Sequence, residues 1–182
     1  NTSYTYYTNG TYIVNLTVTD NDGLSDTVSK AITVNWRDIW VNKSWTKAGY
    51  GDEVAPGKYF GINAFENIQL AIDDALNMES VYVQNNMYDE YVGSHSIDVN
   101  KAISIRGEDR DNVVIYGTGN HDLMIITADG ANVSNMTFIW NSQTTSAITI
   151  EGDNNIFYRN NVTTAKNGIE VKADSTGNLL LE

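Results

Sequence analysis

The chain has 182 residues, a formal net charge of −12 and a pI near 4.4, with 23 acidic and 11 basic side chains. This balance argues against a nucleic-acid partner, because binding phosphates requires a basic surface. Without cysteine and with two histidines, the chain lacks the residues for disulfides, thiolate chemistry or a transition-metal site. No stretch reaches the roughly 20 apolar residues of a membrane span.

The first segment, residues 1–34, alternates apolar and polar residues and predicts a half-buried antiparallel hairpin. A turn is expected at residues 20–23, where Gly23 can take a positive φ, with a partner strand over about 27–34. This acidic turn is interpreted as a plain hairpin turn, with a calcium site as the alternative. The predicted apolar face contains Tyr12, Val14, Leu16 and Val18.

The run from Tyr4 to Gly23, with its Gly-Thr-Tyr and Leu-Thr-Val-Thr-Asp-x-Asp-Gly elements, resembles the C-terminal half of a PKD (polycystic-kidney-disease) domain. The resemblance implies a small immunoglobulin-like β-sandwich in an extracellular protein. The earlier strands of that family and its Gly-Asp-Gly turn are absent. Since two or three strands cannot bury both faces of a sandwich, we expect a partial PKD-like sandwich over 1–34, completed by upstream residues or another chain.

Residues 35–62 form a tryptophan-rich linker. Aromatic residues here can plug the end of the next domain, which is the preferred interpretation, or can form a platform that stacks on sugar rings. The second interpretation makes Trp36, Trp40 and Trp45 candidates for carbohydrate contact.

An amphipathic helix is predicted over residues 64–77, with Asn63 as its N-cap and Glu66 completing a capping-box-like start. We expect this helix to cap a domain that spans residues 63–182. Its apolar face is assigned to Phe65, Ile68, Ile72, Ala75 and Leu76.

From residue 81 onward, apolar triplets recur every 20 to 24 positions, a period that indicates stacked coils. Alternate side chains of a strand point to opposite faces, so the outer members of each triplet can fill a shared interior. Two strand columns per coil are predicted. The first contains residues 81–83, 103–105, 124–126, 148–150 and 169–171, and the second contains 113–115, 136–138, 156–158 and 179–181.

An asparagine directly precedes each triplet of the second column. Stacked amides can hydrogen-bond along a ladder, which is the preferred interpretation; the alternative is that asparagine marks turns. The predicted structural ladder consists of Asn112, Asn135, Asn155 and Asn178.

Two elements, Ile68-Gln69-x-Ala71-Ile72-Asp73-x-Ala75 and Asn100-Lys101-x-Ile103-x-Ile105-x-Gly107, resemble the start of NosD-like and pectin-lyase-like proteins over residues 59–182. The resemblance implies an all-β fold, a right-handed parallel β-helix (solenoid). Beside a PKD-like segment, it is similar to large archaeal cell-surface proteins, especially those of methanogens.

Export to the cell surface is also indicated by seven N-x-S/T sequons. Asn135 is set aside because it belongs to the predicted ladder. The candidates for glycosylation are Asn1, Asn9, Asn15, Asn42, Asn132 and Asn161.

The predicted outward positions do not assemble a catalytic set, which would need paired carboxylates or a base with a metal. In the first column Glu170 is the one acid, and Glu151 and Lys172 are expected to pair across adjacent coils. In the second column the outward residues are unusually apolar, so either the inward and outward phase is reversed or this face packs on another surface. These residues are Val114, Thr137, Phe157 and Leu180.

The sequence therefore favours a non-catalytic, glycosylated structural or adhesive protein of the cell surface, without catalytic residues, metal or cofactor, with calcium in a turn as the alternative. Expected partners are further copies of the chain, other envelope proteins and glycans. The alternative function is a polysaccharide lyase or hydrolase, or a carbohydrate-binding module.

Overall fold

The computed structural model describes residues 10–46, 48–89, 97–142, 144–164 and 167–182. Two compact units are present, with the division between Trp36 and Arg37. The sequon residues Asn1 and Asn9 lie outside the described residues.

The first unit contains an antiparallel hairpin of β1 (Gly10–Thr19) and β2 (Ser25–Val34), as predicted from the alternation. At the turn, Asp20 Oδ1 accepts hydrogen bonds from the backbone N–H groups of Asp22 and Leu24 at 3.0 and 2.9 Å. Gly23 takes a φ of 85° there. The carboxylate of Asp20 thus closes the turn with backbone donors.

The two faces of the hairpin differ in chemistry. On one face, hydroxyl and amide groups bond across the strands, as in the 2.8 Å contact between Thr17 Oγ1 and Thr27 Oγ1. On the other, Leu16 and Val28 stand opposite one another and are 61% and 64% exposed. The described residues of this unit form one two-stranded sheet.

Residues 37–67 supply the first strands of the second unit. β3 pairs in parallel with both β6 and β7, so the predicted linker provides a strand of the solenoid. The elements are β3 (Asp38–Val41), the 3₁₀ helix η1 (Lys43–Trp45), β4 (Glu53–Ala55), β5 (Lys58–Tyr59) and β6 (Ala64–Phe65).

A charged clasp fastens this region to the first full coil. Glu79 is 3% exposed, and its carboxylate contacts Arg37 Nε at 3.2 Å and accepts the backbone N–H of Leu76 at 2.8 Å. Arg37 also donates to the carbonyl oxygens of Ile62 and Asp74. Burial lowers the pKa of Arg37, but hydrogen bonding and the charge of Glu79 outweigh it, so the pKa is raised.

The described residues contain one α-helix, α1 (Ile68–Asp74), which is shorter than the predicted 64–77. Its N-cap is Asn67, whose Oδ1 accepts the N–H of Leu70 at 2.8 Å. The prediction of Asn63 as N-cap is wrong, because residues 64–65 extend as β6 beside β3. Leu76, expected on the buried face, is 46% exposed beyond the helix end.

The lysine of the Asn-Lys-x-Ile element closes the other end of α1. Lys101 Nζ donates to the carbonyl oxygens of Ile72, Asp73 and Ala75 at 3.0, 2.7 and 2.8 Å. The last carbonyls of a helix lack partners within it, and an ammonium also complements the negative end of the helix dipole. This contact gives Lys101 a structural role.

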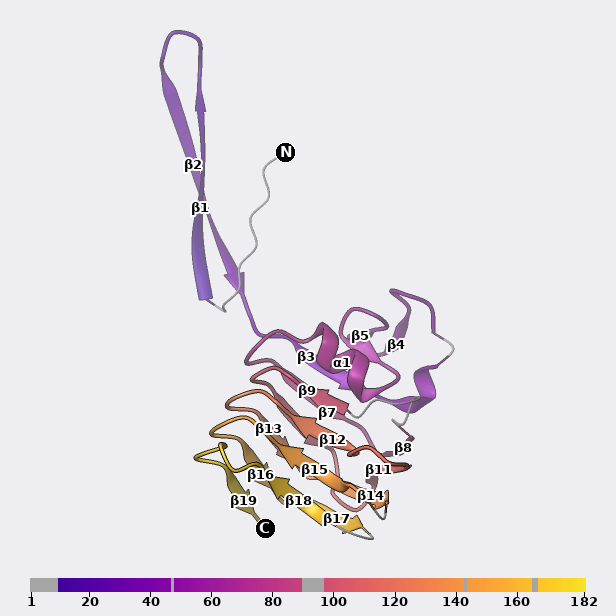
Figure 1. The fold of residues 1–182 in the computed structure, drawn as a ribbon. Coiled ribbons are helices and arrows are strands. Elements are labelled where there is room, and N and C mark those ends of the chain that lie inside the picture. Colours follow the sequence, from indigo (N-terminus) through magenta and orange to yellow (C-terminus); the bar gives the residue numbers. More distant parts are fainter. Residues whose placement is uncertain (1–9, 47, 90–96, 143, 165–166) are drawn as a thin grey trace. The chain divides into compact units, whose positions relative to one another are not determined.

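Beyond α1 the chain winds into a parallel β-solenoid with three sheets (Figure 1). The first sheet has the order β6-β3-β7-β10-β13-β16-β19, the second β8-β11-β14-β17 and the third β9-β12-β15-β18. The strands are β7 (Ser80–Val83), β8 (Asn86–Asp89), β9 (Ile97–Val99), β10 (Ser104–Gly107), β11 (Val113–Thr118), β12 (Met124–Ile126), β13 (Asn132–Ser134), β14 (Thr137–Asn141), β15 (Ser146–Ile150), β16 (Ile156–Tyr158), β17 (Asn161–Thr164), β18 (Asn167–Val171) and β19 (Leu179–Leu181).

The parallel solenoid confirms the repeat prediction, but two columns per coil is wrong because there are three sheets. The predicted first column mixes two of them: Val81 and Ile105 pair in the first sheet, whereas Met124 and Ile148 pair in the third. Inward and outward alternation is the same in every sheet, so the pattern does not reveal to which sheet a strand belongs.

The phase predicted for the second column is reversed at two of its four outward residues. Phe157 pairs with Val133 and is 4% exposed within the core, and Leu180, 47% exposed, pairs with Phe157 in the next coil. Val114 and Thr137 pair with one another and keep the predicted outward phase. Val114 is half-buried, and Thr137 Oγ1 donates to the carbonyl of Arg110 at 2.8 Å.

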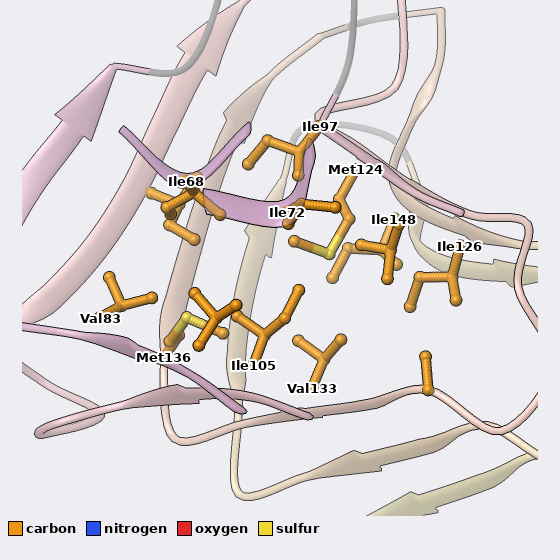
Figure 2. Packing of buried hydrophobic residues seen from close by; sticks show 14 of the residues in the cluster. Ile68, Ile72, Val83, Ile97, Ile105, Met124, Ile126, Val133, Met136 and Ile148 are labelled. Atoms are coloured by element: carbon orange, nitrogen blue, oxygen red, sulfur yellow. The ribbon is translucent and has the colours of Figure 1, made fainter. Parts of the chain in front are cut away.

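The core runs through the stacked coils and beneath α1. Figure 2 shows Ile68 and Ile72 of the helix above Ile105 and Val133 of the coils, with Met124 beside Ile72. These five side chains are fully buried. Burying each aliphatic side chain of this size contributes about 1.5–3 kcal/mol, which makes the shared interior the main source of stability.

Of the predicted asparagine ladder, Asn155 and Asn178 occupy equivalent positions one coil apart. The N–H of Asn155 donates to Asn178 Oδ1 at 2.8 Å, and Asn155 Oδ1 accepts the N–H of Ala131 at 2.7 Å. Asn135 instead takes a positive φ of 63° and donates from Nδ2 to the carbonyl of Gly107. Asn112 is exposed in a turn. The side chains of Asn155 and Asn178 thus bond to backbone groups of the neighbouring coil.

Candidate functional site

The outward side chains of the first sheet form a row that crosses five coils. The strand registers place Trp40 beside Tyr82, Tyr82 beside Arg106, Arg106 beside Ser134, and Ser134 beside Tyr158. Neighbouring strands lie about 4.8 Å apart, so side chains from distant parts of the sequence become immediate neighbours. This row carries both aromatic rings and a guanidinium.

An aromatic stack forms one end of the row. The rings of Trp40 and Tyr82 have centroids 4.8 Å apart and are inclined by 23°. Lys58 Nζ lies 4.2 Å from the centroid of Trp40. The register places Tyr82 between Trp40 and Arg106, so the side of Tyr82 away from Trp40 is the side of Arg106.

A recess of about 270 Å³ opens on this side of the stack. Its floor includes Gly107, where an added Cβ would lie 2.1 Å from the carbonyl oxygen of Asn135. Only glycine permits that close approach of two backbones. The lining residues are Trp40, Tyr82, Val83, Gln84, Arg106, Gly107 and Glu108.

A second recess, of about 330 Å³, shares Arg106 and Glu108 with the first. Three arginines meet in it, although the whole chain has four. The remaining one, Arg37, belongs to the clasp. The lining residues are Arg106, Glu108, Asp109, Arg110, Asp111, Asn135 and Arg159.

The charged groups of the second recess are held in different ways. Arg110 Nε pairs with Asp111 Oδ1 at 3.1 Å, and Asp109 Oδ1 accepts the N–H of Asp111 at 2.9 Å. That backbone hydrogen bond, followed by one from the side chain of Asn112, lowers the pKa of Asp109, which stays ionised at neutral pH. The side chain of Arg106 makes no hydrogen bond or ion pair to another described residue.

The tryptophans predicted to contact carbohydrate take different places. Trp40 lines the first recess, and its ring stacks on that of Tyr82. Trp45 ends η1, and Trp36 is half-buried in the first unit. The sequence analysis missed Tyr82 and the three arginines of the recess. One feature of the sequence could have indicated the recess: the chain has four arginines, and two of them fall in the short stretch Arg106-Gly-Glu-Asp-Arg110.

The described sequon residues differ in access. Asn15 and Asn161 are exposed. Asn42 is half-buried, and its Nδ2, the atom that a glycan would occupy, donates to Gln84 Oε1 at 3.1 Å. Asn132 is half-buried and has an Oδ1 without a hydrogen-bond partner.

The expected pair of Glu151 and Lys172 is replaced by a different one. Lys172 Nζ contacts Glu170 Oε1 on its own strand at 2.8 Å. That hydrogen bond raises the pKa of Lys172. Because both side chains are about half exposed, this contact contributes little to stability.

Acidic residues in the turns accept hydrogen bonds from backbone N–H groups of the next coil. Asp129 Oδ1 accepts the N–H of Asp153 at 2.8 Å, and Asp153 Oδ1 accepts that of Thr176 at 2.6 Å. Across the part of the chain that the structure describes, no group of three or more histidine or acidic side chains is placed to hold a metal ion. Within the same residues, no helix has the length and apolar character to cross a membrane.

No family model matches the chain, and no curated protein or solved structure is significantly similar to it. These comparisons therefore do not support the PKD-like resemblance, the NosD-like resemblance or the archaeal origin. The parallel β-solenoid itself is established by the strand register.

Proposed function

We propose that the chain is an adhesive module of an extracellular structural protein, in which the solenoid presents a carbohydrate-binding row. The observation that carries the proposal is the recess that Tyr82 and Arg106 line together on paired strands. An aromatic face packs against the C–H face of a pyranose ring, and arginine donates hydrogen bonds to sugar oxygens. We therefore assign the predicted glycan partner to the surface formed by Tyr82 and Arg106.

The cell-surface setting rests on the sequence resemblances and on the sequons. Asn15 and Asn161 are exposed and available for a glycan. A PKD-like sandwich that includes the hairpin, and α1 as the N-terminal cap of a right-handed, pectin-lyase-like helix, are the finer parts of the same proposal. They fit the exposed apolar face of the hairpin and the burial of Ile68 and Ile72.

A polysaccharide lyase or hydrolase is the second candidate. The observation that favours it is the presence of Glu108 and Asp109 beside Arg106 in one recess. A carboxylate can act as a general base when it reaches the proton that it removes. Release of unsaturated or reducing sugar from a bound glycan would establish this candidate, and unchanged glycan after prolonged incubation would count against it.

Glycan binding is tested by screening oligosaccharides against the protein and its Tyr82→Ala and Tyr82→Phe variants. We expect binding to fall about tenfold or more in Tyr82→Ala and to persist in Tyr82→Phe, because the ring makes the contact. Tyr116→Ala is the matched control, since Tyr116 is a half-buried tyrosine on the second sheet. Equal binding by Tyr82→Ala and Tyr116→Ala would contradict the proposal. Circular dichroism checks that each variant is folded.

A further inference from the structure

The distribution of arginine is unusual for so acidic a chain. The net charge is −12, yet three of the four arginines line one recess of about 330 Å³. Arginine is the side chain best suited to bind carboxylate, sulfate or phosphate groups, because its planar donors match two oxygens at once. The concentration of guanidinium groups at this recess points to an anionic group.

We propose that the bound glycan is sparsely charged: a neutral pyranose stacks on Tyr82, and a single anionic substituent beside it is held by Arg106 and Arg159. This inference rests on the proposed carbohydrate-binding function and adds the class of ligand. The two recesses are adjacent, because Arg106 and Glu108 line both. One ligand can therefore occupy the aromatic recess and reach the arginines.

The strand register sets the spacing of the two contacts. Tyr82 and Arg106 lie on paired strands, so their backbones are about 5 Å apart. Among the described residues, the side chain of Arg106 has no ion pair or hydrogen-bond acceptor that would compete with a ligand. The anionic group must therefore sit on the stacked sugar or on its direct neighbour.

Arg159 supplies the second guanidinium from two strands further along the sheet. It follows Tyr158, and its guanidinium carbon lies 5.9 Å from the centroid of that ring. A positive φ of 52° turns the chain at Arg159, as a φ of 63° does at Asn135 in the preceding coil. Arg110 contributes less, because its charge is already paired with Asp111.

The acids of the recess argue against a densely charged ligand. Glu108, Asp109 and Asp111 line the same recess as the arginines. Asp109 is held ionised by its hydrogen bonds, and Glu108 Oε2 accepts the N–H of Asn85 at 2.9 Å. A polymer with a charge on every sugar would bring anions against these carboxylates and against the acidic surface. One isolated anionic group avoids that repulsion.

The inference is tested with neutral oligosaccharides, the same backbones carrying one carboxylate or one sulfate, and fully charged polyuronate, all titrated calorimetrically. We expect the singly charged ligands to bind about tenfold or more tightly than the neutral ones, and the polyuronate to show no further gain per sugar. The carboxylate and sulfate arms identify which anion is preferred. Raising the salt concentration should reduce the preference, because charge pairing at an exposed recess is screened.

Arg159→Gln should bring the singly charged ligands close to the neutral affinity while neutral binding is retained, because Arg159 lines only the second of the two recesses. Arg106→Gln should abolish the charge preference and also weaken the neutral ligands, because Arg106 lines the sugar recess. Lys172→Gln removes the same charge directly after β18 of the third sheet and serves as the control. Persistence of the charge preference in both arginine variants, or tighter binding with every added charge, would overturn the inference alone. The proposed function would be overturned as well if the arginine variants lost all binding, including that of neutral ligands, while Tyr82→Ala had no effect.

Discussion

The hairpin and the solenoid use the same alternation of residues and reach opposite degrees of burial. In the hairpin, the apolar pair Leu16 and Val28 stays more than half exposed. In the solenoid, Ile105 and Val133 are paired across coils and fully buried. Both pairs lie on neighbouring strands, so strand pairing by itself does not bury a side chain. Burial requires other layers on the far side, which three sheets and α1 provide in the solenoid.

The difference also explains where a binding surface can form. The row from Trp40 to Tyr158 stands on strands whose inward residues are locked in the core, so its outward side chains have fixed backbone positions. A site held by rigid elements keeps its geometry. In the hairpin, the described residues offer no such support from a second layer.

The largest expected effect comes from the solenoid core. Phe138 is fully buried, and its ring centroid lies 5.7 Å from that of Phe157. Phe138→Ala should lower the free energy of unfolding by about 3–5 kcal/mol, because it removes buried apolar surface and leaves a cavity. Urea unfolding monitored by circular dichroism measures this change.

Leu16→Ala in the hairpin is the matched control, since it also shortens an apolar side chain in a strand. It should change the same free energy by less than about 0.5 kcal/mol, because Leu16 is 61% exposed. Similar losses in the two variants would mean that the hairpin face is covered in solution, and the contrast between the regions would not stand.

A smaller effect is expected at the clasp. Glu79→Ala leaves the N–H of Leu76 without its acceptor and Arg37 with Asp74 as its remaining carboxylate partner, and it should cost roughly 2–3 kcal/mol. The exposed pair of Asp111 and Arg110 provides the control, where Asp111→Ala should cost under about 1 kcal/mol. Thermal unfolding compares the two variants. Equal shifts would show that burial of Glu79 does not strengthen the clasp.

The sequence predicted the architecture better than the site, for a geometric reason. The triplets of 20 to 24 residues report one turn of a solenoid, and they predict stacked parallel strands. They cannot report the number of sheets, because strands such as 103–105 and 124–126 have the same alternation in different sheets. The predicted inward and outward phase is wrong at Phe157, because the buried residue of its triplet is the middle one.

The site depends on the same missing information. Trp40, Tyr82 and Arg106 are separated by tens of residues and become neighbours through the register of the first sheet. Arg159 lines the second recess together with Arg106. A tryptophan cluster is visible in the sequence, but the aromatic residue next to Arg106 in the register is Tyr82. Composition does show that arginine is scarce, whereas only pairing shows that three of the four share a recess.

The smallest expected effect distinguishes a bare hairpin from one covered by a sandwich. Val28→Thr keeps the side-chain shape and replaces a methyl group by a hydroxyl at a position that is 64% exposed. For an exposed face, the free energy of unfolding should change by less than about 0.5 kcal/mol, and binding of an apolar dye should fall, since less apolar surface is presented. Thr27→Val, on the hydroxyl face opposite Thr17, is the control and should raise dye binding.

If the PKD-like sandwich covers the face that carries Val28, Val28→Thr must bury a hydroxyl and cost about 1–3 kcal/mol. In that case the wild-type hairpin would bind no dye, and the proposed sandwich would gain its first support from a measurement in solution.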